Sequence, residues 1–370
     1  MTIKTCKTAV RASTLLAAIA LSGGAFADGG ISESFEGKTV GETLTTSTIS
    51  GLTGNGTYAS GGAETAPAAG FPIPDASGHA TALEIAGTVT YTEGGSPATK
   101  ASQVDFMFKV EPTDELEDPT GSDIRVALAV GTNAANTTTA PIKLWCKTAS
   151  EGAAAWVDLA SAVTTGSWMR ATLVLDYDNS KCSVSLNGDP VLNGTDKWFY
   201  FANNGGSYVA SITMVGSTMV DDFVVTHTAL ANYAIPGGTT AVANAGGVTY
   251  DYINKYGVTV AQAQSSEPLN AESGMSVADK FAAGLDPKSA TKFEMQTMTT
   301  TKDTATVTFP GANPVGRYKV SAKTAGGTEV ATGTISKVST DGENVNSAAI
   351  TIPSANQDEL LYFTVETVAQ

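Results

Sequence analysis

Apolar and polar residues alternate along much of this chain, and the clearest case is the segment 168–192. Apolar residues occupy every second position on both sides of a polar cluster at 178–180, as expected for two strands that each bury one face. The positions on the buried faces are Leu173, Leu175, Tyr177, Val184 and Leu186. The polar cluster consists of turn-forming residues, and Asn-Gly-Asp-Pro at 187–190 turns the chain again. The segment therefore predicts a β-hairpin.

The same alternation predicts strands on both sides of this hairpin. A first region runs from residue 82 to about residue 225, and its inward positions include Val104, Phe106, Phe108, Ile124, Val126 and Leu128. A second region covers residues 292–370, with inward positions at Val307, Phe309, Val320, Ile350 and Phe363. Since each strand has one apolar face, each sheet is expected to bury one side only. We predict an all-β chain with a large N-terminal sandwich and a small C-terminal antiparallel sandwich.

Between these two regions, the spacing of the apolar residues changes from that of strands to that of helices. Residues 230–247 are rich in Ala, Gly and Thr, which is typical of a linker. Apolar and aromatic residues then recur at intervals of four from Val248 to a stop at Gly257. A second short helix is predicted between Ser276, whose N-cap hydroxyl pairs with Asp279, and Gly284.

The N-terminus carries the pattern of a secretory signal peptide over residues 1–27. Three basic residues precede the apolar run 15–21, and Ala25-Phe26-Ala27 provides small residues for cleavage. We expect cleavage after Ala27 and a secreted or extracytoplasmic product, whether periplasmic, cell-surface or extracellular. The apolar run is short for a bilayer span, and no membrane span is expected elsewhere.

Charge and composition narrow the choice of partners. The formal net charge is −15, and removal of the signal peptide lowers Lys+Arg from 21 to 18 against 36 Asp+Glu, which gives −18. A chain this acidic repels phosphate, so nucleic acid is not an expected partner. Only 15% of residues are charged and 42% are hydrophobic, which is typical of an ordered, neutral-polar extracellular β protein.

Three segments resemble the laminin-G-like, or concanavalin A-like, jelly-roll family. In that family an aromatic residue opens one strand and an Asn-Gly turn closes the next, as in 168–192. Ser34-Phe35-Glu36 resembles its opening strand, which pairs with the last strand, and Asp221-Asp222-Phe223 resembles its closing strand. The resemblance covers about residues 31–228 and implies a jelly-roll fold without specifying an activity. The expected organisation is a jelly-roll domain over 28–230, a linker with two short helices over 231–290, and the small sandwich over 291–370.

Residues 273–287 resemble a motif near the C-termini of exported bacterial surface proteins, close to thrombospondin-type-3-like repeats. In such repeats, Asp side chains before the glycine bind calcium. The matching positions here are Asn270 and Glu272, which supply two oxygen ligands where Ca²⁺ takes six to eight. The favoured interpretation is a capped helix that docks the second domain, with calcium as the alternative and no other cofactor.

Two cysteines remain after signal removal, and both fall on core faces of their strands. Cys146 has the parity of Ile142 and Leu144, and Cys182 has that of Val184. In an oxidising compartment, two inward-facing cysteines on neighbouring strands are expected to form a disulfide, worth about 2–4 kcal/mol. The alternative is two separate buried thiols.

Catalytic patterns are not found. No Glu-x-Asp-x-x-Glu pair of carboxylates occurs, and the acidic run 114–118 is interpreted as a solvated loop. The sequence has two histidines, His79 and His227, and each is interpreted as a surface residue. No Cys or His pair has zinc spacing, and no nucleotide-binding glycine pattern is present. We therefore expect a protein that is not an enzyme.

Aromatic residues supply the candidate binding sites. Trp145 has outward parity between Lys143 and Lys147, and Tyr200 belongs to the aromatic run 198–201, while Trp156 and Trp168 are assigned to the core. Trp145 and Tyr200 are the candidate ligand contacts, with packing against a neighbouring loop as the alternative. The expected function is recognition of a polysaccharide or cell-surface glycan. A structural, envelope-associated component that binds a protein partner or itself, and a polysaccharide hydrolase or lyase with an unfamiliar site, are the alternatives.

Overall fold

The structure is a computed structural model that describes residues 30–44, 49–61, 80–112, 116–132, 138–230, 235, 237–311, 318–340, 343–358 and 360–367. The predicted signal peptide with its cleavage position, His79 and part of the acidic run 114–118 lie outside these residues. The chain divides into two compact units. The first unit holds the described residues up to Ala241 together with Thr249–Thr259, and the second unit holds Val242–Val248 and the described residues from Val260 onward.

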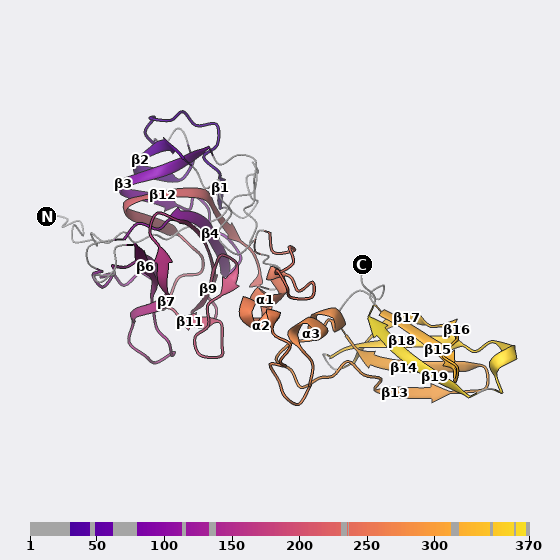
Figure 1. Cartoon of the computed structure of the whole chain (residues 1–370). Helices are drawn as coiled ribbons and strands as arrows, with labels where there is room; N and C mark the ends of the chain where they lie inside the picture. The colour runs from indigo at the N-terminus through magenta and orange to yellow at the C-terminus, as the bar shows by residue number, and fades with distance from the viewer. Residues whose placement is uncertain are drawn as a thin grey trace. The chain divides into compact units, whose positions relative to one another are not determined.

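The first unit contains a large antiparallel sheet (Figure 1). Its strands follow the order β10-β9-β8-β4-β12-β3-β2, while β1 pairs with β12, and β11 pairs with β9. The strands are β1 (Ile31–Glu33), β2 (Leu52–Ser60), β3 (Thr81–Thr92), β4 (Ala101–Lys109), β8 (Trp168–Asp176), β9 (Lys181–Leu186), β10 (Asp189–Pro190), β11 (Trp198–Tyr200) and β12 (Ser211–His227). The predicted hairpin at 168–192 is formed by β8 and β9.

A second sheet, with the order β5-β6-β7, packs against the first. Its strands are β5 (Ala127–Val130), β6 (Thr139–Cys146) and β7 (Ala155–Thr164). Apolar side chains of both sheets form one core cluster, which includes Phe106, Phe108, Leu128, Leu144, Leu173 and Phe199. The first unit is therefore a two-layer antiparallel sandwich of the jelly-roll type.

The opening strand of the first unit is shorter than the sequence pattern predicts. It ends at Glu33, which pairs with Phe223 of β12. Phe35 has a φ of 60°, and its N–H donates to the Glu33 carboxylate at 2.9 Å. This left-handed turn buries the Phe35 ring in the core, so the chain leaves the sheet instead of continuing along it.

The helix α1 (Tyr250–Tyr256) belongs to the first unit. Thr249 caps its N-terminus, and Gly257, with a φ of 61°, ends it as the sequence predicts. The residues of α2 (Val260–Gln264) and α3 (Val277–Ala283) belong to the second unit. The capping box predicted for Ser276 and Asp279 is present in α3, and α2 was not predicted.

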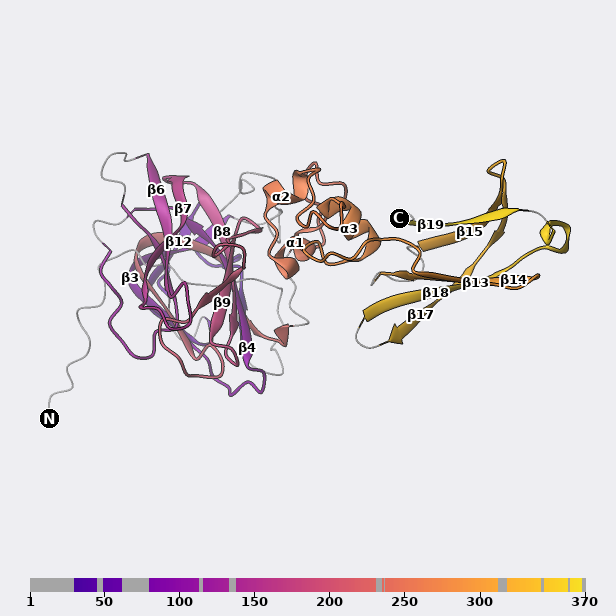
Figure 2. The same cartoon turned by 90° about the horizontal axis from the view of Figure 1, so that it is seen from below.

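The second unit ends in two small antiparallel sheets, drawn in yellow and orange in Figure 2. The order is β13-β14-β18-β17 in one and β16-β15-β19 in the other. The elements are β13 (Thr297–Thr300), β14 (Thr304–Pro310), β15 (Tyr318–Thr324), β16 (Glu329–Thr332), β17 (Thr334–Thr340), β18 (Glu343–Thr351), the 3₁₀ helix η3 (Ser354–Asn356) and β19 (Leu361–Thr367). Phe309 and Ile350 from one sheet and Val320 from the other lie in a single core, which makes a second sandwich.

The predicted all-β class, with a large and a small antiparallel sandwich, is confirmed. Within the described residues, no helix has the length and apolar character needed to cross a membrane.

Candidate functional site

The short strand β11 connects β9 of the large sheet to the residue that follows β6 of the second sheet. Along one edge it pairs with β9, so that Tyr200 is opposite Lys181. On its other edge Tyr200 forms a bridge with Lys147, just after β6, through two backbone hydrogen bonds of 2.9 Å. Residues directly opposite one another in antiparallel strands point to the same face. Lys147, Tyr200 and Lys181 therefore form one row across three strands.

Tryptophans extend this row into a larger surface. Trp198 is two residues before Tyr200 on β11 and shares its face. Trp145 is two residues before Lys147, pairs with Trp156 of β7, and packs in one cluster with Ala202. The ring centroids of Trp145 and Trp156 are 5.6 Å apart. We call this surface the aromatic–lysine face, and it consists of Trp145, Lys147, Trp156, Lys181, Trp198 and Tyr200.

Both candidate ligand contacts from the sequence are on this face, but they differ in accessibility. Trp145 is 9% exposed, because Trp156 and Ala202 cover it. Tyr200 and Trp198 are half-buried and so present part of their rings to solvent. The Lys181 ammonium lies 5.2 Å from the centroid of the Tyr200 ring.

Two of the core assignments made from the sequence need correction. Trp156 is on the outer face of β7, half-buried, because its register places it opposite Trp145. Its indole N–H is buried, with no hydrogen-bond partner among the described residues. Trp168 is also half-buried and packs against Met107, away from the main core cluster.

Cys146 and Cys182 are both buried, as their parity predicts, but both thiols are free. The expected disulfide assumed neighbouring strands. Instead β11 lies between them, since Phe199 pairs with Cys182 and Tyr200 bridges to the residue after Cys146. Strands two positions apart are separated by roughly 9–10 Å, beyond the Cα span of a disulfide. Burial raises the pKa of both thiols, that of Cys146 to about 12.

His227 is not a surface residue, in contrast to the interpretation made from the sequence. Its ring is fully buried, with Nδ1 2.9 Å from the Ser102 hydroxyl and Nε2 3.0 Å from a Glu93 carboxylate oxygen. The same oxygen accepts hydrogen bonds from the Tyr91 hydroxyl at 2.6 Å and from the backbone N–H of Gly30 at 2.8 Å. This cluster links the ends of β3, β4 and β12 to Gly30, the residue before β1.

The Ser102–His227–Glu93 contacts have the residue types of a hydrolase triad but not its accessibility. Ser102 is 1% exposed, and its oxygen accepts a further hydrogen bond from the Val209 N–H at 3.1 Å. A substrate carbonyl cannot approach a nucleophile that is covered in this way. Burial favours a higher pKa for Glu93, but hydrogen bonds from Tyr91, His227 and two backbone N–H groups hold it below its usual value. The hydrogen bonds of Ser102, His227 and Glu93 therefore hold strand ends together and do not form an accessible catalytic site.

The calcium candidates of the second unit are used within their own loop. The Asn270 side-chain oxygen accepts the Glu272 N–H at 2.9 Å, and its amide nitrogen donates to the Lys288 carbonyl at 3.2 Å. Among the described residues, no group of three or more His, Cys, Asp or Glu side chains is placed to hold a metal ion.

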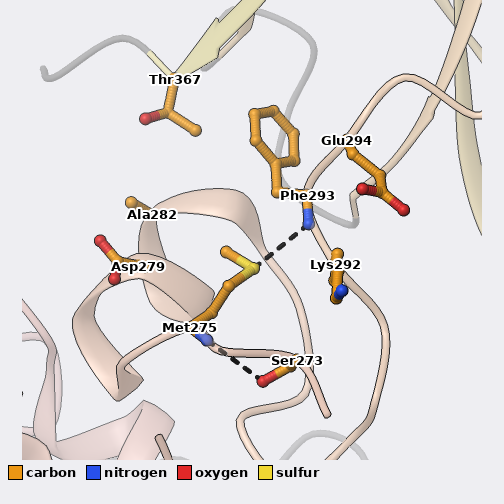
Figure 3. Close-up of a pocket in the computed structure, with 8 residues that line it drawn as sticks. All are labelled: Ser273, Met275, Asp279, Ala282, Lys292, Phe293, Glu294 and Thr367. Carbon is orange, nitrogen blue, oxygen red and sulfur yellow. Dashed lines mark hydrogen bonds between the residues drawn. The ribbon is translucent and has the colours of Figure 1, made fainter. Parts of the chain in front are cut away.

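The second unit also has a shallow, open cavity of about 350 Å³ (Figure 3). Its lining comes from the segment before α3, from α3 and from residues 292–294, with Thr367 at the end of β19. The Met275 sulfur accepts the Phe293 N–H at 3.2 Å across it. Asp279 on the rim is already engaged in the capping box, and Lys292 and Glu294 also line the cavity.

Comparison with known proteins gives no family. No protein-family model matches the chain, and no curated protein is significantly similar to it. Solved structures that share some features include a heptameric SAP-like pentraxin from Limulus polyphemus, at 12% identity over 34% of this chain and 52% of that chain, with a TM-score of 0.19. The chain thus spans about half of the pentraxin's length.

Two further structures are similar to the same limited degree. The catalytic domain of a glycoside hydrolase family 131 protein from Coprinopsis cinerea shares 11% identity over 40% of this chain and 70% of that chain, with a TM-score of 0.24. A sialidase shares 13% identity over 46% of this chain and 14% of that chain, with a TM-score of 0.20. Scores this low support no conclusion about the present chain.

Proposed function

We propose that this protein is a secreted, non-enzymatic binding protein that recognises polysaccharides through the aromatic–lysine face. The observation that supports this most is the placement of Trp198 and Tyr200 side by side on one face of β11, each half-buried. Residues two apart on a strand are separated by roughly 6.6 Å. Flat rings at this spacing can stack against successive units of an extended sugar chain, and the tyrosine hydroxyl and indole N–H supply polar contacts.

The rigidity of this face also supports a binding role. β11 is held on both edges by strand pairing, and its middle residue, Phe199, is buried in the core. Ligand-contacting side chains on such a strand lose little conformational freedom on binding. The face is therefore preorganised for an extended, flat ligand.

A non-catalytic role is consistent with the carboxylates of the first unit. Asp105 lies fully buried, with Arg170 Nε at 2.6 Å and the Thr172 hydroxyl at 2.6 Å, and Glu93 is committed to the His227 cluster. The exposed Asp158 is paired with Lys143 beside the aromatic–lysine face. A retaining glycosidase needs two accessible carboxyl groups about 5–5.5 Å apart, and none of these residues forms such a pair.

Affinity electrophoresis through gels that contain plant, algal or host polysaccharides tests the proposal. The wild-type protein should be retarded by at least one polymer, and Tyr200→Ala should lose about tenfold in affinity, since loss of one stacked ring costs roughly 1–1.5 kcal/mol. Tyr362→Ala is the matched control, because Tyr362 is 43% exposed in the second unit. Retardation of Tyr200→Ala equal to that of the wild type would remove β11 from the site.

Self-association is the second candidate function, and β19 supports it. Among the described strands it pairs with β15 alone, at the edge of its sheet, and Leu360 beside it is 82% exposed. An exposed apolar edge strand can pair with another chain. Sedimentation velocity should then show larger species with rising concentration, and Leu360→Lys should abolish them. A monomer at all concentrations would exclude this role.

A further inference from the structure

The charged residues of the first unit are paired unevenly. Five of the basic side chains described there have a carboxylate partner, namely Lys38 with Glu33, Lys100 with Asp178, Lys109 with Glu111, Lys143 with Asp158, and Arg170 with Asp105. Lys147 and Lys181 are different. Within the described part of the chain, neither ammonium has a carboxylate within 4.0 Å.

The absence of a carboxylate beside Lys147 and Lys181 is not expected from the composition. The chain has 36 acidic residues against 21 Lys and Arg, so an exposed lysine has many potential partners. Both of these lysines are opposite Tyr200, one on each side. Positive charge is therefore concentrated where the proposed sugar-stacking ring is located.

We propose that the ligand of this face is an anionic polysaccharide, one whose repeating unit carries a carboxylate or a sulfate ester. This inference rests on the proposed function and specifies its substrate class. A sugar ring stacked on Tyr200 brings its substituents over the neighbouring strands, where the Lys147 and Lys181 ammonium groups can reach an acidic group on either side. Charge-assisted hydrogen bonds of this kind are stronger than neutral ones.

The net charge of the protein is compatible with such a ligand. At physiological ionic strength, charges more than about 8 Å apart are largely screened, so the local lysines outweigh the distant acidic surface. Duplex nucleic acid, with one charge per roughly 1.7 Å of axis, would be repelled over its whole length. A polysaccharide with isolated acidic groups meets the two lysines without that penalty.

Pairs of polymers with the same backbone and different charge provide the test. Polygalacturonate is compared with its methyl ester, and dextran sulfate with dextran, by titration calorimetry of the full chain. We expect at least tenfold tighter binding of the charged member in at least one pair, and the pair that responds identifies carboxylate or sulfate. Raising the salt concentration should weaken binding of the charged member only.

The double variant K147Q/K181Q should lose the preference for the charged member, while the matched control K302Q/K319Q in the second unit should keep it. Unchanged thermal melting of each variant separates loss of binding from loss of folding.

Equal binding of charged and neutral polymers by the wild type would overturn this inference and leave glycan recognition standing. Preference retained by K147Q/K181Q would also overturn it, and absence of binding to every polymer would overturn both proposals.

Discussion

At the scale of single residues, the buried polar side chains of the first unit are the least expected feature. Asp105 has outward parity in β4, yet it is fully buried, because both faces of β4 and β8 are covered. Burial raises the pKa of Asp105 to about 6, against the lowering effect of Arg170, with which it forms a buried salt bridge. A buried charge of this kind requires its partner to remain in place.

The Glu93 cluster predicts a specific dependence of stability on pH. Because hydrogen bonds hold the pKa of Glu93 below 4.5 in the folded state, its carboxylate stabilises the fold at pH values above 4.5. That contribution is lost as the pH falls through the lowered pKa. The difference in unfolding free energy between the wild type and Glu93→Gln should therefore shrink between about pH 6 and about pH 3. Urea unfolding at each pH measures it, and a constant difference would contradict this account of Glu93.

At the scale of elements, α1 is fixed to the large sheet of the first unit by side chains. Asn254 donates to the Gly188 carbonyl at 2.8 Å and to the Tyr250 carbonyl at 2.9 Å, and the Ser185 hydroxyl donates to its amide oxygen. The Lys197 ammonium donates to the Asn254 carbonyl at 2.8 Å and so binds the C-terminal end of the helix. Although the sequence predicts a linker here, α1 is thus attached to β9 and to the turn after it.

Replacement of Asn254 tests this attachment. Asn254→Ala leaves buried partners at Ser185 and Gly188 without hydrogen bonds, and we expect a loss of about 2–4 kcal/mol in unfolding free energy. Lys255→Ala in the same helix should change it by less than about 0.5 kcal/mol. Urea unfolding compares the two. Similar stabilities for both variants would show that α1 is held by other contacts.

A lysine organises the loop after α3 in the second unit. Lys280 is fully buried, and its ammonium donates to the Ser289 carbonyl at 2.9 Å, to the Ser289 hydroxyl at 3.2 Å and to the Thr291 carbonyl. Burial lowers the pKa of Lys280 from its usual value. The chain therefore provides its own cation next to the segment in which Asn270 and Glu272 were considered as calcium ligands.

We expect Lys280→Met to destabilise the second unit by about 2 kcal/mol, since three oxygens lose their donor. The exposed Lys292→Met should have little effect. Differential scanning calorimetry with calcium and with a chelator completes the test, and the wild-type melting temperature should be the same in both. A rise in melting temperature with calcium would restore Asn270 and Glu272 as metal ligands.

At the scale of the whole molecule, the sequence predicts classes of structure better than it predicts partners. Strand parity places Trp145 on the outside of β6, and capping signals locate the ends of α1 and α3, because these depend on local residues. The alternation of residues along a strand assigns each side chain to a face, but it does not predict that Tyr200 pairs with Lys147, because strand partners are distant in sequence. The aromatic–lysine face, the burial of His227 and the separation of the two cysteines all depend on such long-range pairings.

The uneven pairing of charges is also a property of the whole chain. The net charge of −15 argues against polyanions when it is averaged over the sequence, whereas the fold collects two lysines without a carboxylate partner around one tyrosine. Composition cannot predict this arrangement, because it depends on which lysines have acidic neighbours in space.

A lysine-labelling footprint tests the central claim most directly. The protein is acetylated with and without each polysaccharide, and mass spectrometry compares every lysine. We predict that a bound polysaccharide protects Lys147 and Lys181, while Lys302 and Lys319 in the second unit react equally in both states. Equal labelling of Lys147 and Lys181 with and without every polysaccharide, or protection confined to other lysines, would contradict binding at the aromatic–lysine face.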